Sequence, residues 1–293
     1  MGSRASSVFC LIAAGVLWST SGVILKSLPS VHWLALAGMR SLFAALLFLP
    51  GLARPRPPRA KLVAAVLLYA LLVGTLMGSM QLGTAAQGIW LQYMAPAVVA
   101  LWAWLMQRQR LRPTEIVAVI LTVLAIVLIV TGGRGHSHQQ SVLLGVASGL
   151  AFGFFIILLK SLGEAAPATI FLWTNLGTAA VLLPAAAAVG VPIPTGSREL
   201  LLLAAMGLGQ LALPYYFFQW GLARTRAVEA SLIILLEPIL NPIWVYLALG
   251  EVPGTRVIFG CALIGVALVS MAVFPDRRRG SDPSRVEVPY GGQ

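Results

Sequence analysis

The stretch Leu25-Lys26-Ser27-Leu28 returns as Leu159-Lys160-Ser161-Leu162, 134 positions further along a chain of 293 residues. Other residues repeat in the same order, first at that offset and then, after two slips of four residues, at offsets of 138 and 142. These pairs are Gly15 and Gly149, Pro50 and Pro184, Gln81 and Gln219, Gly83 and Gly221, Pro96 and Pro238, and Trp102 and Trp244. A chance self-match of Ala-, Leu- and Gly-rich sequence is the alternative, but the shared order of distinctive residues favours a duplicated chain.

The composition predicts that both copies lie in a membrane. Hydrophobic residues make up 59% and charged residues 10% of the chain, and the mean hydropathy is +0.90. A soluble domain needs far more charge to cover its surface. The apolar stretches are continuous rather than alternating, so an all-α membrane protein is favoured over a barrel. Ten spans are predicted, near residues 8–26, 33–50, 62–82, 88–106, 114–131, 141–159, 168–189, 200–219, 228–249 and 257–274.

The basic residues predict the orientation of these spans. With the N-terminus in the cytoplasm, 15 of the 20 Lys and Arg residues fall at cytoplasmic ends, four fall at outer ends and Arg40 lies inside a span. Basic residues are retained on the cytoplasmic side, so both chain ends are expected there. The net charge of +11 then reflects orientation and contact with anionic lipid of the bilayer. It does not indicate nucleic-acid binding, because no loop is long enough to form a basic folded domain.

The number of spans makes the two copies inverted. Five spans in each copy is an odd number, so the second copy enters the membrane from the opposite side to the first. The predicted organisation is a first five-helix repeat over 1–134, an inverted second repeat over 135–275, and a basic, disordered cytoplasmic tail over 276–293. Inverted repeats of this kind are typical of secondary transporters, whose substrate site lies near the midplane between the repeats.

The sequence offers little for catalysis, a metal or a cofactor. The only aspartates, Asp276 and Asp282, fall in the predicted tail, and no His-Glu-x-x-His, serine elbow or phosphate loop is present. His136 and His138 stand close together, but without a neighbouring carboxylate or cysteine they do not predict a metal site. We therefore expect a protein that is not an enzyme and that needs no cofactor.

Glu237 is the only carboxylate predicted near the middle of a span. It stands in Leu235-Leu236-Glu237-Pro238-Ile239-Leu240-Asn241-Pro242, where two prolines four residues apart are expected to kink or unwind the helix. Two interpretations remain. Glu237 is either a proton site or a partner for a substrate amine, or it joins Asn241 in satisfying donors around the broken helix.

Arg40 is the only basic residue predicted inside a span, and Thr174 occupies the equivalent position of the second copy. A charge at this depth is costly, so Arg40 either attracts a carboxylate-bearing substrate or snorkels and pairs within the bundle. The structural role is the simpler of the two interpretations.

Helical spacing indicates which faces line a substrate path. Aromatic, methionine, amide and hydroxyl side chains recur on one face of several spans, which suits a small solute with an apolar side chain. The small residues among them equally suit close helix packing. The candidate path residues are Trp18, Ser21, Gly22, Met77, Gly78, Gln81, Tyr93, Met94, Phe152, Phe155, Tyr215 and Gln219.

These features together resemble the EamA type of the drug/metabolite transporter superfamily. The resemblance rests on the inverted five-plus-five spans, Trp18-Ser19-Thr20-Ser21, Arg40, Glu237-Pro238 and Leu249-Gly250-Glu251. More narrowly, the chain is similar to bacterial YddG-type amino-acid exporters. The first copy departs from the pattern, because Ala95-Pro96 stands opposite Glu237-Pro238 and Gln107-Arg108-Gln109 stands opposite Leu249-Gly250-Glu251.

The resemblance implies a carrier of the bacterial inner membrane that exports amino acids, often aromatic or otherwise apolar, and related metabolites. It also implies a central cavity between the first four spans and their repeats, with the fifth and tenth spans at the periphery. A carrier for another solute, such as a drug or a sugar derivative, is the nearest alternative, and an intramembrane enzyme is a remote one. A monomer and an oligomer both fit the sequence, as do proton coupling and facilitated diffusion.

Overall fold

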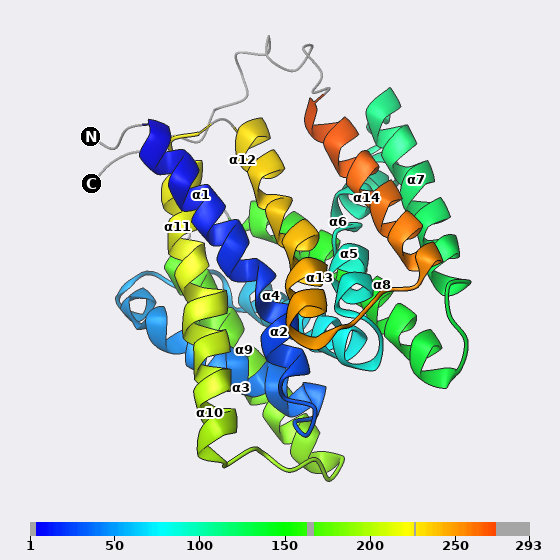
Figure 1. Cartoon of the computed structure of the whole chain (residues 1–293). Helices are drawn as coiled ribbons and strands as arrows, with labels where there is room; N and C mark the ends of the chain where they lie inside the picture. Colours follow the sequence, from blue (N-terminus) through cyan, green and yellow to red (C-terminus); the bar gives the residue numbers. More distant parts are fainter. Residues whose placement is uncertain (1–3, 163–166, 226, 274–293) are drawn as a thin grey trace.

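The computed structural model describes residues 4–162, 167–225 and 227–273, and within these ranges it is entirely helical (Figure 1). The predicted tail, with Asp276 and Asp282, lies outside the described residues. The elements in chain order are α1 Arg4–Ser19, α2 Ser21–Lys26, α3 Trp33–Leu47, η1 Leu49–Ala53, α4 Arg59–Leu82, α5 Ala85–Gln92, α6 Ala95–Gln107, α7 Pro113–Val130, α8 His136–Ser161, α9 Pro167–Ala188, α10 Ser197–Ala204, η2 Ala205–Ala212, α11 Leu213–Leu222, α12 Ala227–Ile234, α13 Leu236–Leu249 and α14 Thr255–Val273.

These elements form the predicted spans. Within the described residues, nine continuous or broken helices are long and apolar enough to cross a membrane, and α3 is a tenth, shorter apolar helix of 15 residues. The prediction of an all-α, ten-helix membrane protein is therefore confirmed. The second span is shorter than the expected 33–50, because the α-helix ends at Leu47 and Pro50 lies in the 3₁₀ turn η1.

Within the described ranges, three spans are broken, each about a third of the way from one of its ends. The first span changes from α1 to α2 at Thr20, the fourth from α5 to α6 after Gln92, and the ninth from α12 to α13 at Leu235. The second and third of these breaks precede Pro96 and Pro238, which lack the N–H group that would continue a helix. The eighth span contains a different irregularity, because η2 between α10 and α11 is a π-helix. Such irregular backbone is expected in a membrane only where it is covered by protein or lines a cavity.

The two predicted copies pack against each other over most of their length. Helix α4 lies against α8 and α9, α3 against α9, and α1 against α11. Glycines allow some of the closest approaches: a Cβ at position 149 would lie 2.4 Å from Met94 Cγ, and one at position 207 would lie 2.5 Å from the Arg40 carbonyl oxygen. Helices α7 and α14 pack against one another at one side of the bundle (Figure 1).

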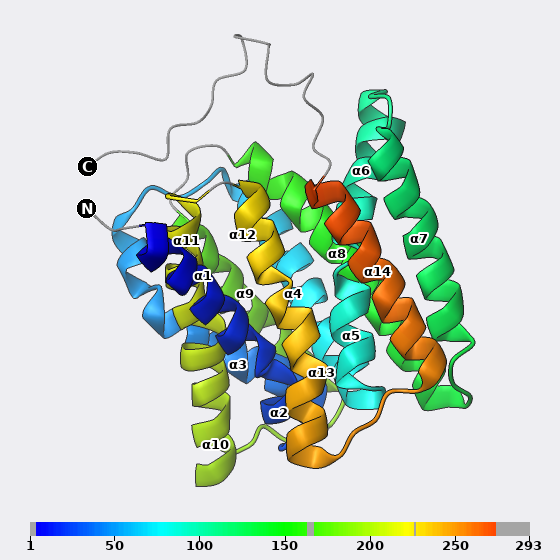
Figure 2. The ribbon, with the colours of Figure 1, turned by 45° about the horizontal axis from the view of Figure 1, so that its top comes forward.

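The two ends of the bundle are held differently. The start of α1 and the end of α14 lie at one end, which we call the terminus end (Figure 2). At the opposite end, Lys26 Nζ lies 2.8 Å from Glu251 Oε2 and donates to the Gly83 carbonyl at 2.6 Å. The Ala85 N–H donates to Glu251 Oε1 at 2.8 Å. We call these four residues the clasp, since they join the end of α2, the α4–α5 turn and the α13–α14 loop.

Candidate functional site

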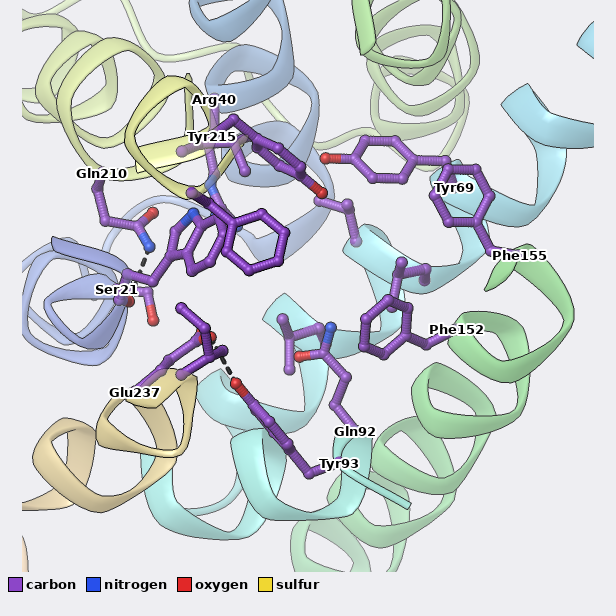
Figure 3. Close-up of a pocket in the computed structure, with 17 residues that line it drawn as sticks. Ser21, Arg40, Tyr69, Gln92, Tyr93, Phe152, Phe155, Gln210, Tyr215 and Glu237 are labelled. Atoms are coloured by element: carbon purple, nitrogen blue, oxygen red, sulfur yellow. Dashed lines mark hydrogen bonds between the residues drawn. The ribbon is translucent and has the colours of Figure 1, made fainter. Parts of the chain in front are cut away.

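A cavity of about 250 Å³ lies in the middle of the bundle, between helices from both predicted copies (Figure 3). Its lining comes from α1 to α5, α8, η2 and α11 to α13. The lining residues are Trp18, Ser21, Arg40, Tyr69, Leu72, Val73, Leu76, Gln92, Tyr93, Phe152, Phe155, Gln210, Leu211, Tyr215, Phe218, Ile234 and Glu237. Their number and spread indicate that any solute in the cavity would contact both halves of the chain.

Aromatic rings form two clusters in the cavity wall. The Trp18 ring lies edge-on to Tyr215, with centroids 5.3 Å apart, and 5.5 Å from the ring of Phe218. Across the cavity, the rings of Tyr69 and Phe155 lie 5.3 Å apart. Rings in such edge and tilted arrangements make rigid apolar walls with a few polar edges. This wall suits a small solute that carries an apolar or aromatic group.

Glu237 provides the carboxyl group of the cavity. It lies in the first turn of α13, immediately after the break at Leu235, and Tyr93 at the end of α5 donates its hydroxyl to Glu237 Oε2 at 2.7 Å. The two residues belong to the corresponding broken spans of the two predicted copies. The Glu237 side chain lines the cavity, and one of its two oxygens accepts the hydrogen bond from Tyr93.

Arg40 provides the positive group. It lies at the middle of α3, is 5% exposed and donates from Nη1 to Met77 Sδ at 3.6 Å, whereas its Nε has no hydrogen-bond partner. Among the residues that the structure describes, Arg40 forms no ion pair. Figure 3 shows Arg40 and Glu237 on opposite sides of the cavity. The cavity thus has a guanidinium on one side and a carboxyl group on the other, with aromatic rings along its wall.

Side chains of the second predicted copy secure the break between α1 and α2. The freed Trp18 carbonyl accepts from Gln210 Nε2 at 2.9 Å. Trp244 Nε1 donates to Ser19 Oγ at 2.9 Å, and Asn241 Nδ2 donates to Ser21 Oγ at 3.0 Å. The first bond satisfies a carbonyl that has lost its helical donor, and the other two tie the hydroxyls on either side of the break to α13, so the break has a fixed geometry beside the cavity.

The structure brings half of the predicted site residues together. Those that line the cavity are Trp18, Ser21, Arg40, Tyr93, Phe152, Phe155, Tyr215 and Glu237. The eight others, which do not line it, are Gly22, Met77, Gly78, Gln81, Met94, Gln219, Pro238 and Asn241.

The residues outside the lining have packing positions. A Cβ at Gly22 would lie 2.7 Å from Asn241 Oδ1, and one at Gly78 would lie 2.8 Å from a Leu144 methyl, so both glycines permit close helix contact. Gln81 Nε2 donates to the Val31 carbonyl at 2.8 Å near the clasp. The remaining members are Met77, Met94, Pro238 and Asn241, which are buried, and Gln219, which is half-buried on α11.

Sequence reasoning missed nine lining residues, of which Tyr69, Gln92 and Gln210 carry polar atoms. Tyr69 and Gln92 stood on spans that were already candidates: Gln92 directly precedes the predicted Tyr93, and Tyr69 lies about two turns before Met77. Gln210 follows Gly207 and Gly209 in the π-helix, which no simple helical period predicts. An amide in an apolar span was the available signal for Gln210.

Comparison with known proteins identifies the family. The EamA-like transporter family matches the chain twice, over residues 5–131 and 139–273. The chain belongs to this family. An uncharacterized transporter of Archaeoglobus fulgidus is 27% identical over 259 residues, which cover 87% of this chain and 92% of that protein. A crystal structure, described only as that of a protein, aligns with a TM-score of 0.65 at 20% identity, covering 94% of this chain and all of the other. This EamA-like chain is therefore a multi-pass membrane transporter.

Proposed function

We propose that this transporter exports amino acids with aromatic, other apolar or neutral side chains, and related small metabolites. Substrate would enter the central cavity, and the two predicted copies would expose that cavity to each side of the membrane in turn. The observation that carries the proposal is the cavity itself, which combines aromatic rings with one buried cation and one carboxylate.

The size of the cavity supports a small substrate. A volume of about 250 Å³ is slightly below the roughly 300–1,000 Å³ of typical ligand pockets. A solute the size of a single amino acid suits this volume better than a peptide or a lipid. The charges of Arg40 and Glu237 complement a zwitterion, and the rings of Trp18, Tyr215 and Phe218 complement its apolar side chain.

We further propose that the terminus end of the bundle faces the cytoplasm of a bacterial inner membrane. The support is the concentration of Lys and Arg in the connections at that end, such as 54–61 and 108–112. Export then means that substrate enters from the terminus end and leaves past the clasp.

Uptake into liposomes that hold the purified protein tests the proposal. The labelled panel is tryptophan, phenylalanine, methionine, threonine and glutamate, each with and without an imposed pH gradient. We expect saturable uptake of the apolar members above that of empty liposomes. A dependence on the pH gradient would show proton coupling, and loss of that dependence in Glu237→Gln would assign the coupling to Glu237, which is the cavity's carboxylate.

A matched pair of tryptophan variants makes the test specific to the cavity. Trp18→Ala removes a ring from the wall, and we expect about tenfold weaker apparent affinity from the lost aromatic contacts. Trp104→Ala removes a ring that is 50% exposed on the outside of α6, and we expect it to leave uptake unchanged. Folded protein that takes up no member of the panel would refute the proposed substrate class.

A further inference from the structure

Arg40 is a buried cation without an anionic partner. Its side chain reaches the cavity from the middle of α3, and it is 5% exposed. Its only hydrogen bond to a described residue is the one from Nη1 to the Met77 thioether, and its Nε has none. A guanidinium carries five N–H donors and accepts no hydrogen bond. Most of the hydrogen-bonding capacity of Arg40 is therefore unused.

Such an arrangement is costly unless something else completes it. A charge at this depth in a membrane protein is normally paired with an opposite charge or with backbone carbonyls. Met77 is fully buried, and its sulfur is a weak acceptor that cannot neutralise the guanidinium. Among the described residues, no anion therefore contacts the guanidinium directly.

The carboxylate of the cavity does not pair with Arg40. Glu237 Oε2 accepts the Tyr93 hydroxyl, and the two charged residues occupy opposite sides of the cavity in Figure 3. The described part of the chain has no ion pair between them. The space between them is instead bordered by the rings of Trp18 and Tyr215. A ligand that spans this space can reach both groups.

The backbone around Arg40 is also held in place. A Cβ at position 207 would lie 2.5 Å from the Arg40 carbonyl oxygen, so Gly207 lets η2 pack directly on α3 at this residue. The same π-helix supplies Gln210 to the cavity wall and to the Trp18 carbonyl. This packing fixes the base of the Arg40 side chain relative to the Trp18 ring.

We propose that Arg40 is the carboxylate-binding group of the cavity and sets the specificity of the transporter for solutes with a carboxylate. The inference rests on the proposed function. A substrate carboxylate accepts two parallel hydrogen bonds from the guanidinium, a geometry that planar Arg provides and Lys does not. In an amino acid, the ammonium group then points across the cavity to Glu237, and the side chain lies against the aromatic wall.

The test compares an amino acid with its carboxamide, which differ only in the carboxylate. The amino acid of the panel that wild-type protein takes up best serves as the labelled substrate, and unlabelled amino acid and carboxamide compete with it at mildly acidic pH. We expect the carboxamide to compete at least about tenfold less well, because it lacks the charge-assisted bidentate contact. This measurement needs no variant, so it does not depend on the folding of a mutant.

Three variants of the two charged residues show which group causes the preference. In Arg40→Gln we expect the amino acid to lose affinity until it competes no better than its carboxamide, whereas Arg40→Lys keeps part of the difference. Glu237→Gln is the matched control on the opposite side of the cavity, and it should retain the preference for the carboxylate. Folding of each variant is checked by its thermal unfolding midpoint.

The outcomes separate this inference from the proposed function. A carboxamide that competes as well as the amino acid in wild-type protein, or a folded Arg40→Gln variant that keeps the preference, overturns the role of Arg40 while transport itself persists. Uptake of no panel member overturns the proposed function, and this inference with it.

Discussion

The two ends of the bundle contain equivalent lysines in different surroundings. Lys26 and Lys160 match in the repeat, and so do Glu251 and Gln109. At the clasp end, Lys26 and Glu251 form an ion pair that also holds the backbone of Gly83 and Ala85. At the terminus end, Lys160 is exposed and has no ion pair with a described residue, and Gln109 Nε2 donates to Gln107 Oε1 in its own segment.

This difference predicts that opening the clasp end requires free energy to break a charged contact that the equivalent positions of the terminus end do not make. Separating α2 from the α13–α14 loop requires breaking an ion pair whose side chains are each 20% exposed, together with at least one of the two hydrogen bonds that join Lys26 and Glu251 to the α4–α5 turn. Hydrogen bonds to charged groups each contribute about 1.5–3 kcal/mol. The equivalent positions at the terminus end have no acidic residue, so this particular ion pair is present at the clasp end only.

Reversing one charge of the clasp should have the largest effect. Lys26→Glu places a carboxylate beside Glu251, so the conformation open at the clasp end should gain population. Ser21→Cys in a Cys10→Ala, Cys261→Ala background reports on the cavity. We expect impermeant thiol reagent added on the clasp side to label it about tenfold faster, which corresponds to a shift of about 1.4 kcal/mol.

The exchanged pair is the control for this experiment. Lys26→Glu combined with Glu251→Lys restores opposite charges and should return labelling toward the starting rate. If the exchanged pair labels as fast as the single variant, the ion pair is not what holds this end closed.

Supplying the missing acid at the terminus end should have a smaller, opposite effect. Gln109→Glu offers Lys160 the partner that Lys26 already has. An exposed ion pair contributes about 0.2–1 kcal/mol, so labelling of the same reporter from the terminus side should slow by up to about fivefold. Adding Lys160→Gln should reverse the effect, and so should high salt. Unchanged labelling at low salt would show that these two positions do not meet.

The smallest predicted effect is on the pH dependence of folding stability, at His32 near the clasp end. His32 caps α3, where its Nδ1 accepts from the Leu34 N–H at 3.3 Å, and burial lowers the pKa of its imidazole from 6.5. The folded protein therefore disfavours the protonated form, so this contribution to stability is present above about pH 6.5 and is lost as the pH falls below it.

Thermal unfolding between pH 8 and pH 5 measures the contribution of His32. We expect His32→Asn, which can also cap the helix, to reduce the loss of stability at low pH by a small amount. Identical pH profiles for wild type and His32→Asn would contradict the assignment.

Hydropathy was sufficient to predict the spans, because a continuous apolar stretch of membrane length has few alternative structures. It did not predict the faces that those spans turn to the cavity. On α4 the predicted face ran through Met77, Gly78 and Gln81, whereas the cavity is lined by Tyr69, Leu72, Val73 and Leu76. In an apolar span both faces avoid water equally well, so the rotation of the helix is set by packing against neighbouring helices.

The π-helix bears on one residue of the eighth span. Tyr215 and the predicted Gln219 both lie in α11, after η2, and only Tyr215 lines the cavity. The wide turns of η2 shift the helical phase before α11. Gln210 and Tyr215, five residues apart, therefore both line the cavity, whereas the Tyr216 hydroxyl donates to the Leu47 carbonyl on α3. Arg40 and Glu237 were identified correctly as unusual, because ionisable groups in an apolar span are conspicuous in any helical phase.

The shortness of α3 has a consequence for the surrounding lipid. Its 15 residues give a helix of roughly 22 Å at 1.5 Å per residue, compared with about 30 Å for a typical hydrocarbon core. A short span is accommodated by local thinning of the bilayer, at a fraction of a kcal/mol per Å of mismatch. Because Arg40 stands at the middle of this helix, thinning brings headgroups and water closer to its guanidinium from both leaflets. The thickness of the surrounding bilayer therefore affects the free energy of burying the charged guanidinium of Arg40.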